Sequence, residues 1–214
     1  MIDGTLLPLA SKPELHGENY LSRKRFYAIV MLVVCDDQSR ITHYHIGWPG
    51  SVHDNRVWRN CKLNLESEAM FSPKEYLLGD SAFTPSTRMV PPFKACPGQA
   101  MENYKTAFNT LLAKPRVKSE HCIGILKGRF PFLRCIPLKL AKKRHMKRMI
   151  KHVRGTVVLH NFSIKENINW GYQEEDDEEE QGTLDQEQTD DEENDLRRSE
   201  VLFYLSELEE TNIN

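Results

Sequence analysis

The 214-residue sequence predicts an α/β fold in which helices pack on one mixed β-sheet. Strand-like segments fill the first half of the chain and helix-like segments follow from about residue 102, with no internal repeat. Hydrophobic residues make up 39% of the chain, which is enough for the buried core of one domain of ordinary size.

Five segments have the composition of strands or edge strands. Residues 2–10, IDGTLLPLA, alternate in polarity with the period of a strand that buries one face. Residues 25–37, RFYAIVMLVVCDD, and 41–50, ITHYHIGWPG, are rich in β-branched and aromatic residues around a short polar turn, which predicts a hairpin. Residues 75–80, EYLLGD, predict a further central strand, whereas the prolines of residues 89–95, MVPPFKA, fit only an edge strand or a loop.

Three segments have helical patterns. Residues 51–61, SVHDNRVWRNC, follow a Pro-Gly break and predict the start of a capped helix. A second helical pattern runs from about residue 102 to 127, and we expect Pro115 to interrupt it. Residues 141–167 predict a last, basic helix. Its apolar side chains on one side are Met146, Met149, Ile150 and Val153.

Charge divides the chain into two parts. Residues 1–172 hold 27 of the 29 Lys and Arg and 13 of the 31 Asp and Glu, a net charge of +14 with histidine neutral. Residues 173–195 hold 14 acids and no base, and such a run cannot bury enough apolar surface to offset the entropy of ordering it. We predict a folded domain over residues 1–165, an acidic disordered segment over 166–196, and a short tail over 197–214 with helical spacing of apolar residues.

The composition argues against several classes of protein. The five cysteines are odd in number and form no C-x-x-C pair, which favours a reducing, intracellular compartment over a disulfide framework or a structural zinc site. The longest apolar run, FYAIVMLVVC, is about half the length of a bilayer span, so we expect no membrane segment. The excess positive charge favours a polyanionic partner such as DNA, and a face that only maintains solubility is the alternative.

Four carboxylates fall at positions that suit a metal site: Asp3 on the first strand, Asp54 at a helix entry, Asp80 at the end of a central strand and Glu120 on a later helix. Each also has a structural alternative, which is a turn for Asp3 and Asp80, a helix cap for Asp54 and a solvated helix face for Glu120. Together, inside a basic domain, they provide the oxygen ligands that two hard cations such as Mg²⁺ or Mn²⁺ require to flank a phosphate.

Three further features have two interpretations each. Lys127 and Arg129 follow Glu120 by seven and nine positions, where they either contact DNA phosphates or form a solvated basic turn. His53 at the helix entry either orients a ligand or has a structural role. Residues 141–148, AKKRHMKR, are either a nuclear-localisation or nucleic-acid patch or the wet face of an amphipathic helix.

A series of ordered motifs resembles the DDE-type endonuclease domain of Harbinger transposases and of the host nucleases derived from them. The motifs are MIDGT, GWPGSVHDNRVW, YLLGDSAF, RVKSEHCIGILKGRFPFL and VVLHNF. The resemblance runs from Met1 to about Phe162. It implies a ribonuclease-H-like fold, a divalent-metal site and the cleavage of double-stranded DNA.

The resemblance also assigns roles to individual residues. Carried over by motif, Asp3, Asp80 and Glu120 are the expected catalytic acids, and Asp54 matches a further acid expected on a metal. Gly79 is expected to let its strand end sharply so that Asp80 meets the metals. The family normally carries a helix-turn-helix-type region before the first catalytic strand, and we expect that region to be lacking, because the sequence begins two residues ahead of Asp3.

Two functions follow from these observations. The first is a divalent-metal-dependent DNA endonuclease that hydrolyses phosphodiester bonds, with a Myb-like helper protein as the partner that the resemblance implies. The second is a domesticated, non-catalytic nuclear protein that binds DNA or chromatin through the basic domain. Either function predicts a nuclear protein, with the cytoplasm as a further location.

Overall fold

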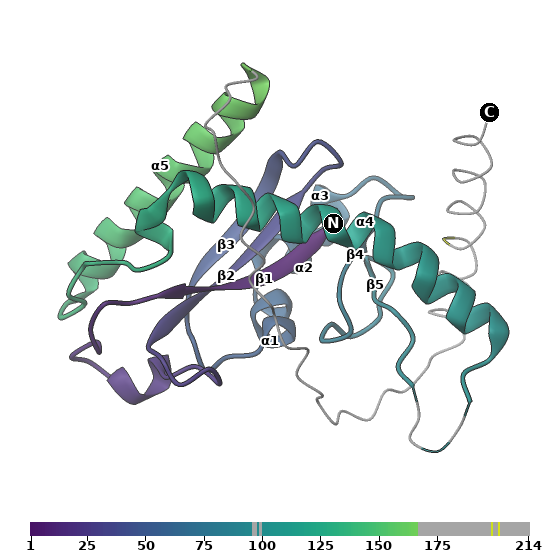
Figure 1. Ribbon diagram of the computed structural model, residues 1–214, viewed down its shortest axis with the longest axis horizontal. Helices are drawn as coiled ribbons and strands as arrows, with labels where there is room; N and C mark the ends of the chain where they lie inside the picture. Colours follow the sequence, from purple (N-terminus) through teal and green to yellow (C-terminus); the bar gives the residue numbers. More distant parts are fainter. Residues whose placement is uncertain (96–97, 99, 167–197, 199–200, 202–214) are drawn as a thin grey trace.

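The computed structural model describes residues 1–95, 98, 100–166, 198 and 201 (Figure 1). Most of the predicted acidic segment and of the tail therefore lies outside the described residues. The described helices and strands are, in chain order, β1 (Ile2–Pro8), η1 (Gly17–Tyr20), β2 (Ala28–Cys35), β3 (Ile41–Pro49), α1 (Asp54–Arg59), α2 (Lys62–Leu65), α3 (Ser67–Met70), β4 (Leu77–Leu78), β5 (Met89–Val90), α4 (Asn103–Arg129), η2 (Pro131–Leu133) and α5 (Lys143–Lys165).

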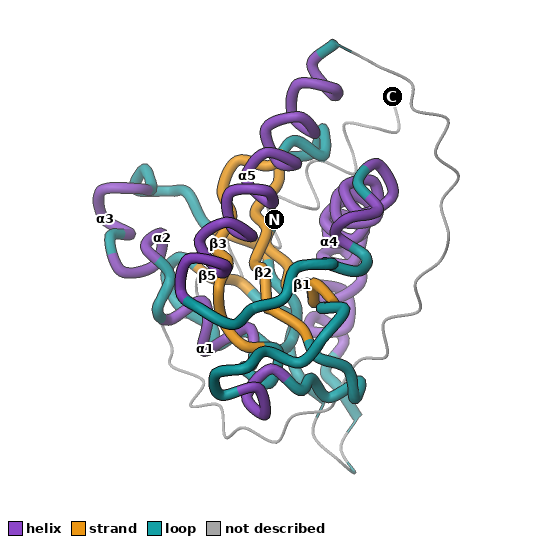
Figure 2. Tube along the Cα trace, turned by 90° about the vertical axis from the view of Figure 1, so that its left-hand side faces the viewer, coloured by secondary structure: helices purple, strands orange, loops and turns teal. Residues whose placement is uncertain are grey.

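The central sheet is antiparallel, in the order β1-β2-β3. All eight residues of β2 are buried because both faces of the sheet are covered. The odd-numbered residues of β2, such as Met31, pack into the cluster that includes Leu126 of α4 and Met149 of α5. The even-numbered ones, such as Leu32, pack with Trp58 of α1. Figure 2 shows α4 on one side of this sheet and α1, α2 and α3 on the other.

The predicted hairpin is confirmed, because β2 and β3 pair in antiparallel register on either side of a short turn. The single mixed sheet is not found, since the described strands form two sheets and β4 and β5 pair in parallel as a separate one. The strand predicted over residues 75–80 contracts to two residues. Its partner β5 stops where Pro91 and Pro92 follow, because proline cannot donate a ladder hydrogen bond.

Helix α4 runs unbroken through Pro115, contrary to the predicted interruption. A proline inside a helix costs roughly 3 kcal/mol through a lost hydrogen bond and a steric clash. Tertiary packing on both sides offsets this cost. Leu112 is buried in one cluster before the proline, and Leu126 is buried in the central cluster after it.

Helix α5 presents the predicted apolar face to the central sheet. Met149 and Val153 are buried, and Met146 and Ile150 are half-buried against the same cluster. Basic side chains occupy the opposite face. No described helix is both long enough and apolar enough to cross a membrane.

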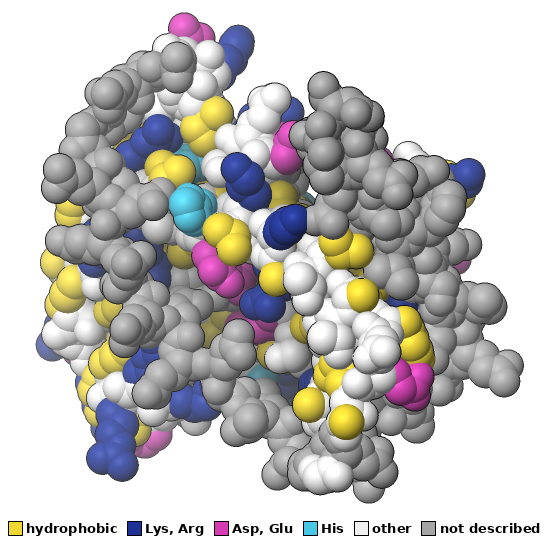
Figure 3. All heavy atoms as spheres, turned by 45° about the vertical axis from the view of Figure 1, so that its right-hand side comes forward, with side chains coloured by type: hydrophobic (Ala, Val, Ile, Leu, Met, Phe, Trp, Pro, Cys, Tyr) yellow, Lys and Arg dark blue, Asp and Glu magenta, His cyan; other side chains and the backbone are white. Residues whose placement is uncertain are grey.

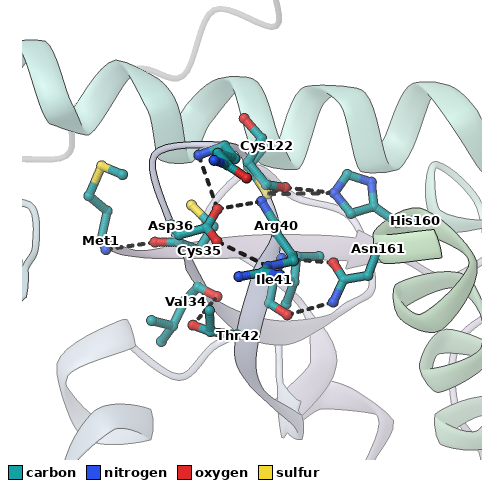
Figure 4. Close-up of polar contacts among 12 residues, drawn as sticks. Met1, Val34, Cys35, Asp36, Arg40, Ile41, Thr42, Cys122, His160 and Asn161 are labelled. Atoms are coloured by element: carbon teal, nitrogen blue, oxygen red, sulfur yellow. Dashed lines mark hydrogen bonds and ion pairs between the residues drawn. The ribbon is translucent and has the colours of Figure 1, made fainter. Parts of the chain in front are cut away.

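Hydrogen bonds join the C-terminal half of α5 to the turn of the β2–β3 hairpin (Figure 4). The Asn161 side chain accepts a hydrogen bond from the Ile41 amide at 2.9 Å and donates one to the Ile41 carbonyl at 2.7 Å. His160 Nε2 lies 2.9 Å from the carbonyl oxygen of Ser39. Burial lowers the pKa of His160 and favours its neutral form. The VVLHNF motif therefore has a structural role in joining α5 to the sheet.

Two residues of the tail are described, and both contact the domain. Val201 is fully buried in a cluster with Val90 and Leu112. The Arg198 guanidinium lies over the Phe93 ring, 4.2 Å from the ring centroid. These contacts place this part of the tail against the N-terminal half of α4.

Candidate active site

Asp3 lies near the start of β1, on an edge strand of the central sheet. β1 pairs with β2 on one side, and the first half of its other side has no strand partner among the described residues. Alternation along β1 places Asp3 on the same face as Leu7, which packs in the α4-covered core. Its side chain bends toward the backbone of the next residue, because Oδ1 accepts a hydrogen bond from the Gly4 amide at 2.8 Å.

Asp54 approaches the same point of β1 from the opposite face. It is the first residue of α1, whose cap is His53, and His53 makes no side-chain capping bond. A β-carbon on Gly4 would overlap the Asp54 carboxylate, so only glycine allows this carboxylate to lie against the strand backbone. The glycine of the IDGT motif therefore provides space for Asp54, which is not the helix cap.

Asp80 follows β4 and lies close to the start of β1. A β-carbon on Gly79 would lie 2.8 Å from a ring carbon of Phe83 and 3.4 Å from a methyl carbon of Ile2. Gly79 thus packs next to the residue that precedes Asp3. Its φ is not in the left-handed region, so close packing explains this glycine better than the predicted sharp strand end.

The Asp80 carboxylate also has the role that the sequence offered as an alternative to metal binding, because it closes a turn. Oδ1 accepts a hydrogen bond from the Ala82 amide at 2.9 Å, and the Phe83 amide donates to the Asp80 carbonyl at 3.3 Å. The side chain remains half-buried. A single hydrogen bond to one carboxylate oxygen leaves Asp80 with further lone pairs for a ligand.

A side-chain bridge joins the segment that carries Asp54 to the segment that carries Asp80. Asn55 Nδ2 donates to the Thr84 hydroxyl at 2.7 Å, and the Thr84 amide donates to Asn55 Oδ1 at 3.1 Å. Asn55 is only 6% exposed. Sequence reasoning missed both residues, because the bridge spans 29 positions and the motifs show only that Asn55 adjoins Asp54, whereas Thr84 lies beyond the motif that contains Asp80.

Replacing Asn55 with alanine is expected to destabilise the fold by about 1–3 kcal/mol, because the half-buried Thr84 amide loses its partner and the Thr84 hydroxyl keeps only a long contact from Arg59 at 3.5 Å. Asn60 provides a matched control, since it is exposed and bonds only the Arg56 carbonyl within its own helix. Urea unfolding of the two alanine variants measures the difference. Equal midpoints for both variants would show that the bridge does not hold the two segments together.

Glu120 occupies the middle of α4, the helix that covers the Asp3 face of β1. Its side chain is 53% exposed, and Oε1 lies 3.7 Å from Arg116 Nη2 one turn earlier. Leu112, two turns before it, packs with half-buried Leu78 of β4. Cys122, just after it, packs in the central cluster. Glu120 therefore lies along α4 between β4 and the central sheet, with its carboxylate paired at the surface.

Arg129, one of the two predicted phosphate contacts, is the last residue of α4. Burial lowers its pKa, the neighbouring Cys122 opposes that shift, and its positive charge in turn lowers the pKa of His160. Its buried Nη1 has no hydrogen-bond partner among the described residues. Arg129 as a whole is half-buried near the end of α4. Lys127 is half-buried on the same helix.

The predicted metal ligands are only partly assembled. Asp3, Asp54 and Asp80 come from three segments that meet around the edge of β1, and carboxylate oxygens are the ligands that Mg²⁺ and Mn²⁺ prefer. Within the described part of the chain, however, no three His, Cys, Asp or Glu side chains converge closely enough to hold a metal ion. The approach of Asp3 and Asp54 from opposite faces of β1 is one physical reason.

The fold is a mixed α/β domain in which the segments that carry Asp3, Asp54 and Asp80 meet at the edge of one strand. The chain belongs to the DDE superfamily endonucleases, whose family model matches residues 2–161, and this range contains all four predicted acids. The family resemblance drawn from the motifs is thereby confirmed.

Curated relatives agree with this assignment. The chain is 26% identical over 158 residues to the putative nuclease HARBI1 of Homo sapiens, and equally to that of Bos taurus. The aligned part is 73% of this chain and 43% of each relative, so the chain spans less than half of their length. No solved structure matches the chain significantly.

Proposed function

We propose that the protein is a divalent-metal-dependent DNA endonuclease that hydrolyses phosphodiester bonds. One observation carries the proposal: the three segments that carry Asp3, Asp54 and Asp80 meet at the edge of β1, inside the region matched by the endonuclease family. Asp54 reaches this edge because Gly4 leaves space for it, and Asp80 reaches it because Gly79 packs against Ile2.

Asp3, Asp80 and Glu120 are the proposed catalytic acids, and Asp54 is the proposed further ligand or support. A bound Mg²⁺ or Mn²⁺ would supply Lewis-acid activation of water and stabilisation of the leaving oxygen. Glu120 can act with the other acids only if its ion pair with Arg116 breaks. This step has a low cost, because an exposed ion pair contributes about 0–1 kcal/mol.

A ribonuclease-H-like fold is part of the proposal. An antiparallel β1-β2-β3 sheet, a short β4 whose end lies beside the start of β1, and a long helix over one face support it. In this arrangement Asp3 and Glu120 belong to the same side of the sheet. Asp80 follows the neighbouring strand.

Double-stranded DNA is the proposed substrate and partner. The net charge of +14 on residues 1–172 supports it, because a phosphate backbone requires neutralising charge. Figure 3 shows the described Lys and Arg side chains spread over the face in view rather than gathered in one patch. A Myb-like helper protein and a nuclear location remain proposals that rest on the family resemblance and on the exposed basic face of α5.

Millimolar Mg²⁺ is expected to raise the melting temperature of the protein, because a ligand that binds only the native state stabilises it by mass action. Asp80→Asn should remove most of this rise. Glu68→Gln is the control, since Glu68 is an exposed acid on α3, away from β1. Differential scanning fluorimetry across a Mg²⁺ titration measures the shift. An identical rise in wild type and Asp80→Asn would place the bound metal elsewhere.

A second candidate function is a non-catalytic nuclear protein that binds DNA or chromatin. It is favoured by the surface pairing of Glu120 with Arg116 and by the incomplete gathering of the acids among the described residues. This candidate predicts tight duplex binding without metal-dependent nicking. The two functions thus differ in one measurable activity.

The acidic segment, which lies outside the described residues, gives a further prediction. Its 14 acids are tethered to a domain of net charge +14, so they compete with DNA at high effective concentration. A chain that ends at Tyr172 should bind duplex DNA more tightly than the full chain at low salt, and the gain should shrink at high salt. Fluorescence anisotropy at two ionic strengths measures both affinities. Equal affinities at low salt would leave the segment as a solubilising or partner-binding element.

A further inference from the structure

Two buried cysteines meet between the central sheet and α4. Cys35 ends β2 and is 2% exposed, and Cys122 lies on α4 and is fully buried. Both belong to the central cluster, and the neighbouring Cys122 side chain lowers the pKa of the Cys35 thiol. Figure 4 shows the two residues together beneath the turn of the β2–β3 hairpin.

Polar groups surround the Cys122 sulfur even though it is buried. The Cys122 sulfur is 3.2 Å from the Ser39 carbonyl oxygen and 3.9 Å from His160 Nε2. Ser39 belongs to a hairpin turn whose tip, Asp37 and Gln38, is exposed to solvent. The two buried sulfur atoms therefore lie below a turn that is exposed at its tip.

We propose that Cys35 and Cys122 are an oxidation site that closes into a disulfide between β2 and α4. The oxidant is a peroxide. The Cys35 sulfur attacks one peroxide oxygen, which becomes the sulfenic acid, and the other oxygen leaves as water after protonation. The Cys122 sulfur then attacks the sulfenic sulfur, its thiol proton leaves with the hydroxyl as a second water, and the S–S bond forms. Two thiols are oxidised and one peroxide is reduced to two waters.

The disulfide links the part of α4 that carries Glu120 to the strand paired with β1. Cys122 is two positions after Glu120, and Cys35 ends the strand in which Val33 pairs with Asp3. The bond would hold the sheet and the helix at a fixed separation. The inference does not depend on catalysis, because it concerns only these two thiols and the elements that carry them.

The test treats the full-length protein with hydrogen peroxide, unfolds it, alkylates the remaining thiols and maps the peptides by mass spectrometry. The expected result is a disulfide-linked pair of peptides that contain Cys35 and Cys122, absent after reduction. The melting temperature should rise by roughly 5 °C or more, because the bond closes a long loop, and reduction should reverse the rise.

Cys61→Ser is the matched control, because Cys61 is also 2% exposed but lies in the cluster on the other side of the sheet. This variant should still form the linked peptide pair, whereas Cys35→Ser should not. Full alkylation of Cys35 and Cys122 after peroxide, or oxidation of either one to a sulfinic acid without the link, would overturn the proposal. The wild-type peptide map decides the question even if a variant fails to fold.

Discussion

Asp80→Asn is expected to reduce nicking of supercoiled plasmid on the order of 100-fold or more, because the amide removes the negative charge that a divalent cation requires. The fold should persist. Asparagine Oδ1 can accept the same hydrogen bond from the Ala82 amide that Asp80 accepts at 2.9 Å. Duplex affinity should be unchanged or tighter, since a negative charge near the phosphates is lost. Gel-based nicking and anisotropy on the same preparation measure both effects.

Asp36→Asn is the matched control for this substitution. Asp36 also closes a turn, with Oδ1 accepting from the amide two positions later at 3.0 Å, but this turn belongs to the β2–β3 hairpin rather than to the segment that follows β4. This variant should nick as wild type does. Equal nicking by wild type and Asp80→Asn would show that the activity comes from another protein in the preparation or from another site.

Gly4→Ala is expected to lower nicking about tenfold or more, in the range seen when a supporting group of a metal site is lost. The added methyl group would overlap the Asp54 carboxylate, so Asp54 must rotate away from β1. The substitution leaves the Asp3 carboxylate in the protein. Nicking rates at several Mg²⁺ concentrations should show a higher Mg²⁺ requirement in the variant.

Gly124→Ala controls for the substitution itself. Nothing lies within 4 Å of a β-carbon at Gly124, which is half-buried on α4 four positions after Glu120. Replacing glycine by alanine inside a helix should raise stability by about 0.5–1 kcal/mol and leave nicking unchanged. If Gly4→Ala nicks like Gly124→Ala, the position of Asp54 against β1 has no part in the activity.

Local patterns predicted the parts of the fold that depend on local chemistry. The β2–β3 hairpin follows from two β-branched runs around a polar turn, and the buried face of α5 follows from the spacing of Met149 and Val153. Pro115 was expected to break α4, and only the packing of Leu112 and Leu126 on either side explains why it does not. Such packing joins segments far apart in the sequence, and periodicity does not reveal it.

In the candidate site, too, local patterns predicted some features, and others depend on contacts between distant segments. Asp3, Asp54, Asp80 and Glu120 could be selected because each adjoins a recognisable motif. Two other features depend on how separate segments meet. These are the space that Gly4 leaves for Asp54 and the bridge between Asn55 and Thr84. Chain spacing contains no signal for these contacts. The surface pairing of Glu120 with Arg116, one helical turn apart, could have been anticipated from their sequence separation.

Metal-dependent nicking by the purified protein tests the central claim most directly. Supercoiled plasmid is incubated with wild type and with Asp80→Asn, each stripped of metal and then supplied with Mg²⁺, Mn²⁺, Ca²⁺ or chelator. A DNA endonuclease should convert the plasmid to the nicked form with Mg²⁺ or Mn²⁺ only, and only in wild type. Tight plasmid binding with no nicking under any metal would contradict the proposed endonuclease and support the non-catalytic DNA-binding function.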